Sequence, residues 1–175
     1  MKKTWLMLLT AVALLAATVT PTLAHTEADP YEAPLYAGSP HYYGEPGPKD
    51  LSWYLAHRNE VGSVFVWNDA ENLYVTYSTA VGMTETHLAV AIELEDIPQT
   101  RKGNPKVGRF PHKHEGLGGA ITDPYTIPLD GLSGEIIIAA HAVLVGGETA
   151  WADCGGPDAY FPGNNWATYF TYTVQ

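Results

Sequence analysis

The stretch Asn72-Leu73-Tyr74-Val75-Thr76-Tyr77-Ser78 decides the fold class, because apolar and polar side chains alternate along it. In an extended strand, successive side chains point to opposite faces of the sheet. The period of two therefore places Leu73, Val75 and Tyr77 on one face and the other residues on the opposite face. This pattern is typical of a half-buried β-strand.

A second apolar stretch, residues 61–67, precedes this strand across the connection Asn68-Asp69-Ala70-Glu71. Two such stretches joined by a short polar connection predict an antiparallel β-hairpin. In the first strand of the hairpin, we expect Val61, Phe65 and Trp67 to share one face, with Trp67 in the core.

Further short apolar runs lie outward from the hairpin, separated by Gly, Pro, Asn and Asp, and they predict strands over residues 84–94, 121–129, 135–145 and 166–175. Pro124 and Pro128 favour an edge position for the second of these, because proline lacks a backbone donor. Residues 135–145 are apolar on both sides, which favours a strand covered on both faces. Two packed antiparallel sheets bury these faces, and we predict an all-β fold, an antiparallel β-sandwich.

The composition limits the classes of function. The chain has 175 residues, of which 46% are hydrophobic and 16% are charged, and this suffices for one domain with a core. The formal net charge of −10 excludes a nucleic-acid-binding protein, which needs clustered cations. Cys154 is the single cysteine, so no disulfide forms within the chain. We expect it to form an intermolecular disulfide or to stay an unpaired, partly buried thiol.

The N-terminus has the three regions of a secretory signal peptide: Lys2 and Lys3, an apolar run over residues 5–15, and small residues at Thr22 and Ala24. The apolar run is shorter than the roughly 20 residues that a membrane-spanning helix needs. We expect cleavage after Ala24, which removes both lysines and takes the net charge from −10 to −12. The sequence predicts a secreted or cell-surface protein with no membrane span after processing.

Residues 25–57 are rich in Pro, Gly and Tyr and show neither a strand nor a helix period. Such a composition is typical of an extended arm. The predicted organisation is a signal peptide over residues 1–24, this extended Pro/Tyr-rich N-terminal arm, and a β-sandwich domain over residues 58–175. An extended arm has the chemistry to dock along an exposed sheet edge of a neighbouring copy.

Six blocks of sequence follow one another between residues 60 and 175: WNDAENLYV (67–75), TETHL (84–88), GNPKVGRFP (103–111), IAAHA (138–142), ETAW (148–151) and FPGNNWATYF (161–170). In this order they resemble a module that recurs in exported and surface-exposed microbial proteins. The resemblance implies export and a β domain. It implies no established activity and no catalytic residues.

Several residues are candidate metal ligands. Cleavage after Ala24 exposes His25, whose free amine and imidazole would chelate copper. Glu85 and His87 share a face of one predicted strand and His141 lies on another, and together they have the chemistry of a zinc or copper site, although spacing alone does not bring them together. Acidic turns offer oxygen ligands for calcium, although no repeated D-x-D-x-D loop is present. The alternative for each is structural, as a core histidine or a solvated acid.

Exposed tyrosine and tryptophan side chains are the candidate contacts with a partner, because they stack on sugar rings and are enriched at protein interfaces. They are Tyr42, Tyr43 and Trp53 in or near the arm, and Trp151 and Tyr160 late in the chain.

The sequence contains neither a G-x-S-x-G nor an H-E-x-x-H motif, and it favours no catalytic site. We therefore predict a noncatalytic exported module that binds or assembles at the cell surface or in the extracellular matrix. Its partner is expected to be an extracellular protein, a copy of itself or a glycan. A metal-binding secreted protein and a carbohydrate-binding module are the alternatives.

Overall fold

The computed structural model describes residues 30–37, 59–153 and 160–175 of the chain. Within these ranges the fold is all-β, as predicted, and the strand pairings are antiparallel. The strands are β1 (Tyr31–Ala37), β2 (Asn59–Asn68), β3 (Asn72–Ala91), β4 (His112–Pro128), β5 (Glu135–Leu144), β6 (Thr149–Ala152) and β7 (Phe170–Thr173). Two short 3₁₀ helices, η1 (Leu94–Asp96) and η2 (Val107–Arg109), lie between β3 and β4. Among these residues no helix has the length and apolar character to cross a bilayer.

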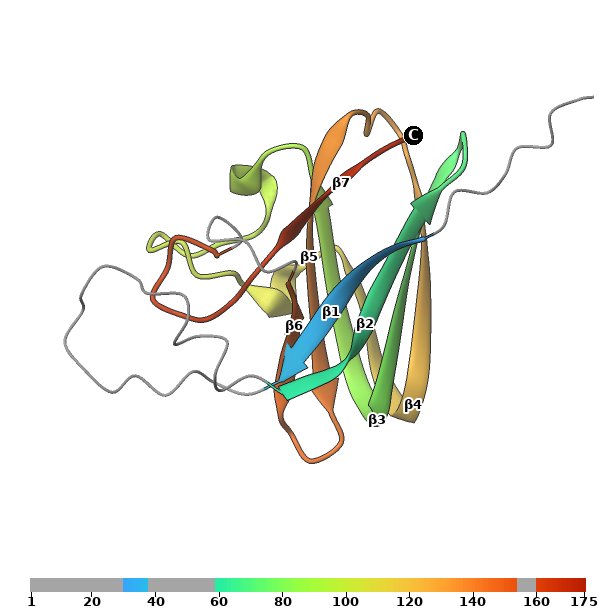
Figure 1. Cartoon of the computed structure of the whole chain (residues 1–175). Coiled ribbons are helices and arrows are strands. Elements are labelled where there is room, and N and C mark those ends of the chain that lie inside the picture. The colour runs from blue at the N-terminus through green and yellow to red at the C-terminus, as the bar shows by residue number, and fades with distance from the viewer. Residues whose placement is uncertain (1–29, 38–58, 154–159) are drawn as a thin grey trace, which may run out of the picture.

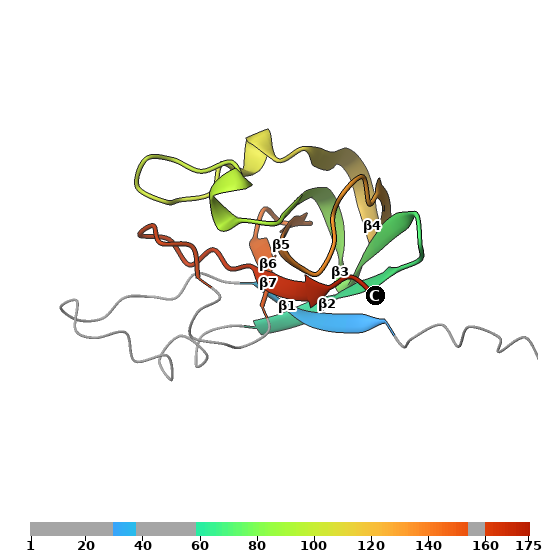
Figure 2. The ribbon, with the colours of Figure 1, turned by 90° about the horizontal axis from the view of Figure 1, so that it is seen from above.

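The strands form one sheet in the order β4-β3-β2-β1-β6-β5-β7, with an additional pairing between β3 and β5. One edge of β3 pairs with β4 along most of its length, whereas the other edge pairs first with β2 and then with β5. Because β1 and β6 link β2 to β5, the pairings close into a circuit, and the sheet folds back on itself into two layers (Figures 1 and 2). The predicted β-sandwich takes this form, and its layers share the bent β3 and β4.

The bend in β3 and β4 depends on glycine. The pairing register of the two strands shifts between Ser78 and Met83. A Cβ atom added to Gly82 would lie 2.7 Å from the Cα atom of Gly119, which is too close for two carbon atoms. Gly119 itself has a φ of 90°, which only glycine adopts at little cost. The two strands therefore cross the corner between the layers in direct backbone contact, at a place where corners of sandwiches commonly use bulges.

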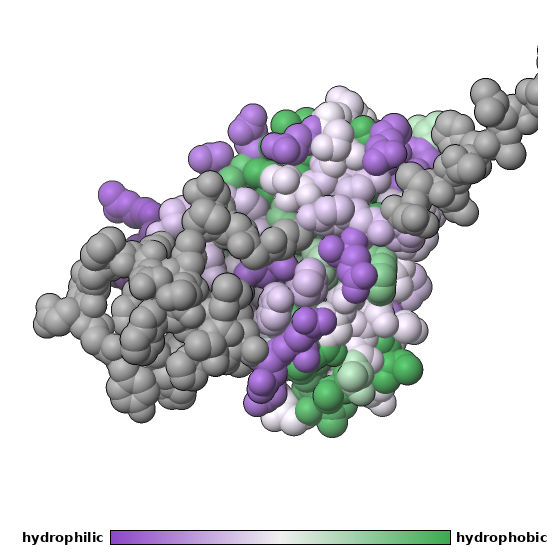
Figure 3. Space-filling view, viewed as in Figure 1, coloured by the Kyte–Doolittle hydropathy of each residue, from purple (hydrophilic) through white to green (hydrophobic). Residues whose placement is uncertain are grey.

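Exposed aliphatic side chains gather at this corner. Figure 3 shows the hydrophobic surface at the end of the molecule where β3 and β4 bend and where β5 turns into β6. Val81, Ile121 and Val145 are among the exposed large hydrophobic residues, at 43%, 58% and 54% exposure. The backbone N–H of Val145 donates to the carbonyl of Gly82, which joins the β5–β6 turn to the bend.

The main core fills the space between the layers. Leu73, Val75 and Tyr77 are fully buried there, which confirms the face that the alternation predicted. Leu88 and Ile138 are among the residues of the opposite layer that pack against the same cluster. The edge position of β4 and the double-sided burial of β5 are also as predicted.

The predicted hairpin is confirmed, but the predicted face of its first strand is wrong. Val64 and Val66 are fully buried, whereas Trp67 is half-buried on the outside and stacks on Tyr74 with ring centroids 5.3 Å apart. The physical reason is register: Val66 lies opposite Val75, and residues that face each other across antiparallel strands point to the same side.

The predicted arm is wrong for residues 31–37. They form β1, which lies between β2 and β6 in the middle of the sheet. Ala33, Leu35 and Ala37 are buried in the main core. Pro34 is tolerated although it lacks a backbone donor, and its carbonyl accepts a hydrogen bond from the backbone N–H of Asp153. The domain therefore begins inside the predicted arm, whose remaining residues lie outside the described ranges.

A core truncation tests whether β1 belongs to the domain. Replacing Leu35 with alanine should lower the free energy of unfolding by about 2–5 kcal/mol, because it removes buried methyl groups and leaves a cavity. The matched control, Ile121→Ala, removes a similar side chain that is 58% exposed and should change stability by about 0.5 kcal/mol or less. Urea denaturation measures both. Equal losses for the two variants would show that residues 31–37 do not pack in the core.

Candidate functional site

The outer face of β3, β5 and β6 carries a second buried cluster, which we call the outer core. Small side chains such as Ala89 and Ala139 line this face and leave room for large ones. Two segments that lie across the face, residues 92–111 and 160–169, fill that room with aromatic and aliphatic side chains. The outer core consists of Ala89, Ala91, Ile97, Phe110, Ala139, Trp151, Phe161 and Ala167.

Aromatic contacts hold the outer core together. The ring of Trp151 lies 6.3 Å from that of Phe110 and 6.1 Å from that of Phe161, and Phe161 in turn meets Tyr169 edge-on at 5.3 Å. Buried aromatic pairs of this kind add stability beyond the burial of their area. Both overlying segments are thereby fixed to the sheet.

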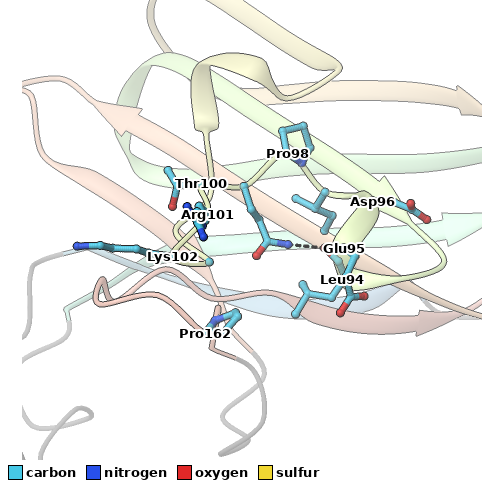
Figure 4. Close-up of a pocket in the computed structure, with 11 residues that line it drawn as sticks. Leu94, Glu95, Asp96, Pro98, Thr100, Arg101, Lys102 and Pro162 are labelled. Carbon is cyan, nitrogen blue, oxygen red and sulfur yellow. Dashed lines mark hydrogen bonds between the residues drawn. The ribbon is translucent and has the colours of Figure 1, made fainter.

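The segment over residues 92–111, which we call the cover segment, also has internal hydrogen bonds. The backbone N–H of Lys106 donates to the carbonyl of Pro98 at 2.7 Å, and the N–H of Thr100 donates to that of Asn104 at 2.8 Å. The side-chain amide of Gln99 donates to the carbonyl of Leu94 at 2.5 Å (Figure 4). A long loop with these bonds keeps one shape over the sheet.

The cover segment meets the late segment closely. A Cβ atom added to Gly103 would lie 2.8 Å from the Cγ atom of Pro162, and one added to Gly163 would lie 2.7 Å from the backbone nitrogen of Asn104. Glycine at both positions thus permits the two segments to touch.

A depression of about 600 Å³ opens on the cover segment (Figure 4). We call it the loop depression. Its wall is mixed in character, and its charged and hydroxyl-bearing residues are Glu95, Asp96, Thr100, Arg101 and Lys102. The remaining lining residues are Leu94, Ile97, Pro98, Gln99, Gly103 and Pro162.

The lysine and arginine residues of the described ranges lie in or directly after the cover segment. Every lysine and arginine in the described ranges falls between Arg101 and Lys113, although acidic residues are spread over the whole domain. Lys113 forms an ion pair with Glu115 at 2.9 Å. No ion pair within the described ranges engages Arg101 or Lys102, and both are exposed. The cover segment therefore has four cations (Arg101, Lys102, Lys106 and Arg109) beside three acids (Glu93, Glu95 and Asp96) on an otherwise acidic protein.

Beside the outer core, a row of side chains crosses the strands. Cross-strand pairing places Lys113, His87, His141 and Trp151 opposite one another on β4, β3, β5 and β6. The His87 and His141 rings lie 5.5 Å apart, and the His141 ring meets Trp151 edge-on at 4.8 Å. Both histidines are buried, at 5% and 6% exposure, and the Nδ1 atom of each has no hydrogen-bond partner.

Burial keeps these two imidazoles neutral. Burial first, and the neighbouring His87 second, lower the pKa of His141 to about 3. Burial also lowers the pKa of His87, although the carboxylate of Glu85, whose Oε2 lies 3.8 Å from Nε2, opposes this shift. Tyr77 lies in the main core, and its hydroxyl donates a hydrogen bond to the backbone carbonyl of His87 at 2.9 Å.

The predicted zinc or copper ligands Glu85, His87 and His141 do lie close together. Within the described residues, however, no group of three or more histidine, cysteine or acidic side chains is arranged to hold a metal ion. Here the three residues form a polar cluster at the edge of the outer core. The copper prediction for His25 concerns a residue outside the described ranges.

The predicted contact aromatics have different outcomes. Trp151 is only 5% exposed and lies in the outer core, so its predicted partner contact is wrong; it belongs to the short strand β6 rather than to a loop. Tyr160 is half-buried, and its backbone forms an isolated antiparallel β-bridge with Thr168. Tyr42, Tyr43, Trp53 and Cys154 lie outside the described residues.

A second polar network fills the inner side of the corner. The carboxylate of Asp123 accepts a hydrogen bond from the hydroxyl of Thr86 and lies 2.9 Å from Nδ1 of His114. The His114 ring stacks on Tyr125 with centroids 4.3 Å apart, and Tyr125 donates to the carbonyl of Thr86. A buried carboxylate needs such partners, and the network stabilises the bent β4. Sequence reasoning missed it, because only the bend brings residues 114 and 123 face to face.

The buried histidine predicts a pH dependence of stability. The unfolded chain protonates His141 near pH 6.5, whereas the folded chain protonates it only near pH 3. Protonation of His141 therefore favours the unfolded chain. The free energy of unfolding should not depend on this group above pH 6.5, and it should decline as the pH falls from 6.5 toward 3. In urea denaturation at a series of pH values, His141→Phe should lose less stability over this window than the wild type. Parallel profiles for the two proteins would contradict the burial of a neutral imidazole.

Comparison of the chain with protein-family models, with curated proteins and with solved structures gives no match.

Proposed function

We propose that the chain is an exported, noncatalytic β-sandwich that binds a partner at the cell surface or in the extracellular matrix, with the loop depression as its contact surface. The observation that supports this proposal is the outer core. Phe110, Trp151 and Phe161 fix the cover segment to the sheet and so present a depression of about 600 Å³ in one shape.

Rigidity of this kind favours binding. Ligand sites lie disproportionately on loops that a stable scaffold positions, and a loop that is already ordered loses little conformational entropy when a partner binds. The volume of the depression is in the range of ligand pockets. Charged and hydroxyl-bearing residues line it, and such residues give a binding site its specific contacts.

Export is supported by the N-terminal sequence, which carries two lysines, a short apolar run and small residues before His25. The net charge of −10 favours a protein that stays in solution until it meets its partner. The partner in this proposal is therefore an extracellular macromolecule.

Fractionation of the producing cells tests the proposal. The protein should be found in the medium or the envelope, and its intact mass should match a chain that begins at His25. A chain that retains residues 1–24 in the cytosol would overturn export.

Sedimentation with the isolated envelope tests the contact surface. Asp96→Trp places a large side chain at an exposed position in the lining of the loop depression. It should weaken binding by about tenfold, because the indole would block contacts between the depression and the partner. Glu148→Trp makes the same exchange on the exposed β5–β6 turn and should bind as the wild type does. Equal binding of Asp96→Trp and the wild type would place the contact elsewhere.

A further inference from the structure

The cations of the described residues are confined to one segment. No lysine or arginine of these ranges lies outside residues 101–113, although the chain as a whole has 19 acidic and 9 basic residues. On a protein with a net charge of −10, cations that were spread evenly over the surface would each lie among more numerous acidic residues. Their concentration on residues 101–113 gives the described surface one place where positive side chains are available to an anion.

Two of these cations belong to the loop depression. Arg101 and Lys102 line it, are exposed, and have no ion-pair partner within the described residues. The guanidinium of an arginine matches a carboxylate with two parallel hydrogen bonds, and a lysine adds a point charge. Lys106 and Arg109 lie in the cover segment and Lys113 lies on β4, and none of the three lines the depression.

The rest of the rim suits a molecule rich in hydroxyl groups. Glu95 and Asp96 accept hydrogen bonds, and Thr100 offers both a donor and an acceptor. These carboxylates oppose the approach of any anion, so a ligand that carries negative charge also needs hydroxyl groups that donate to them. Pro98 and Pro162 add apolar surface, against which the C–H face of a sugar ring can pack.

We infer that the loop depression binds an acidic polysaccharide, with the carboxylates of its uronic acid units on Arg101 and Lys102 and its hydroxyl groups on Glu95 and Asp96. This inference rests on the proposed function and adds the class of ligand. Exposed ion pairs are weak one at a time and are screened by salt, so the binding at this single depression is weak and falls as salt rises.

Affinity electrophoresis of the mature protein through gels that contain polygalacturonate tests the inference. Polygalacturonate should retard the protein, and its methyl-esterified form, which has the same backbone without the charge, should not. Raising the salt from 50 to 500 mM should weaken the retardation by about tenfold or more.

Two variants with equal charge locate the site. Arg101→Gln/Lys102→Gln removes two cations from the loop depression and should weaken the binding by about tenfold or more. Lys106→Gln/Arg109→Gln removes two cations from the same segment outside the depression and should bind nearly as the wild type does. Equal losses in both variants would show general attraction to the segment, and no retardation of the wild type would overturn the acidic ligand.

Competition separates this inference from the proposed function. If soluble polygalacturonate displaces the wild type from the isolated envelope, both stand. If the envelope binds the protein through the depression and polygalacturonate does not compete, the acidic polysaccharide is wrong while the proposed function stands. Sedimentation velocity on the same samples detects an alternative occupant: a dimer that Arg101→Gln/Lys102→Gln abolishes would assign the depression to a second copy and overturn the inference.

Discussion

The close backbone contact between β3 and β4 is the constraint on which the rest of the structure depends. Where Gly82 meets Gly119, both strands turn from one layer into the other. The turn lets one edge of β3 pair with β2 before it and with β5 after it, so that a single sheet encloses the main core. The same turn brings His114 over Asp123 and Tyr125. The buried carboxylate of Asp123 contacts the His114 ring and so stabilises the bend that the two glycines permit.

The outer core is the second level of organisation. A sheet in a sandwich usually leaves one face to water, but here small side chains on β3 and β5 make a hollow that aromatic residues of two loops fill. The filling has a functional consequence, because the cover segment gains a fixed shape without being part of the sheet. The depression, its lining residues Arg101 and Lys102 and the buried histidine pair all lie on or beside this added layer.

The fold class was predictable from the sequence because alternation reports directly on burial, as at Leu73, Val75 and Tyr77. The face of β2 was not, because Phe65 with Trp67 and Val64 with Val66 form equally good apolar pairs, and only the register to β3 selects one. β1 escaped detection because Pro34 and the surrounding turn-forming residues conceal a buried alternation of Ala33, Leu35 and Ala37. At the site, the shared face of Glu85 and His87 followed from strand periodicity, but the position of His141 beside them did not, because the sequence does not tell which strands pair. The loop depression did not, although one signal was visible: beyond Arg58, every cation lies within residues 101–113.

The central position of β1 also affects the order in which the molecule can form. β1 pairs with β6, whose residues 149–152 come late in the chain, so the circuit of strands stays open until most of the polypeptide is present. Pairings between such distant segments form slowly, since a long loop must close before the contact is made. If the chain is exported as proposed, it would cross the membrane before β6 is available to pair with β1, and the sheet would be completed only after export.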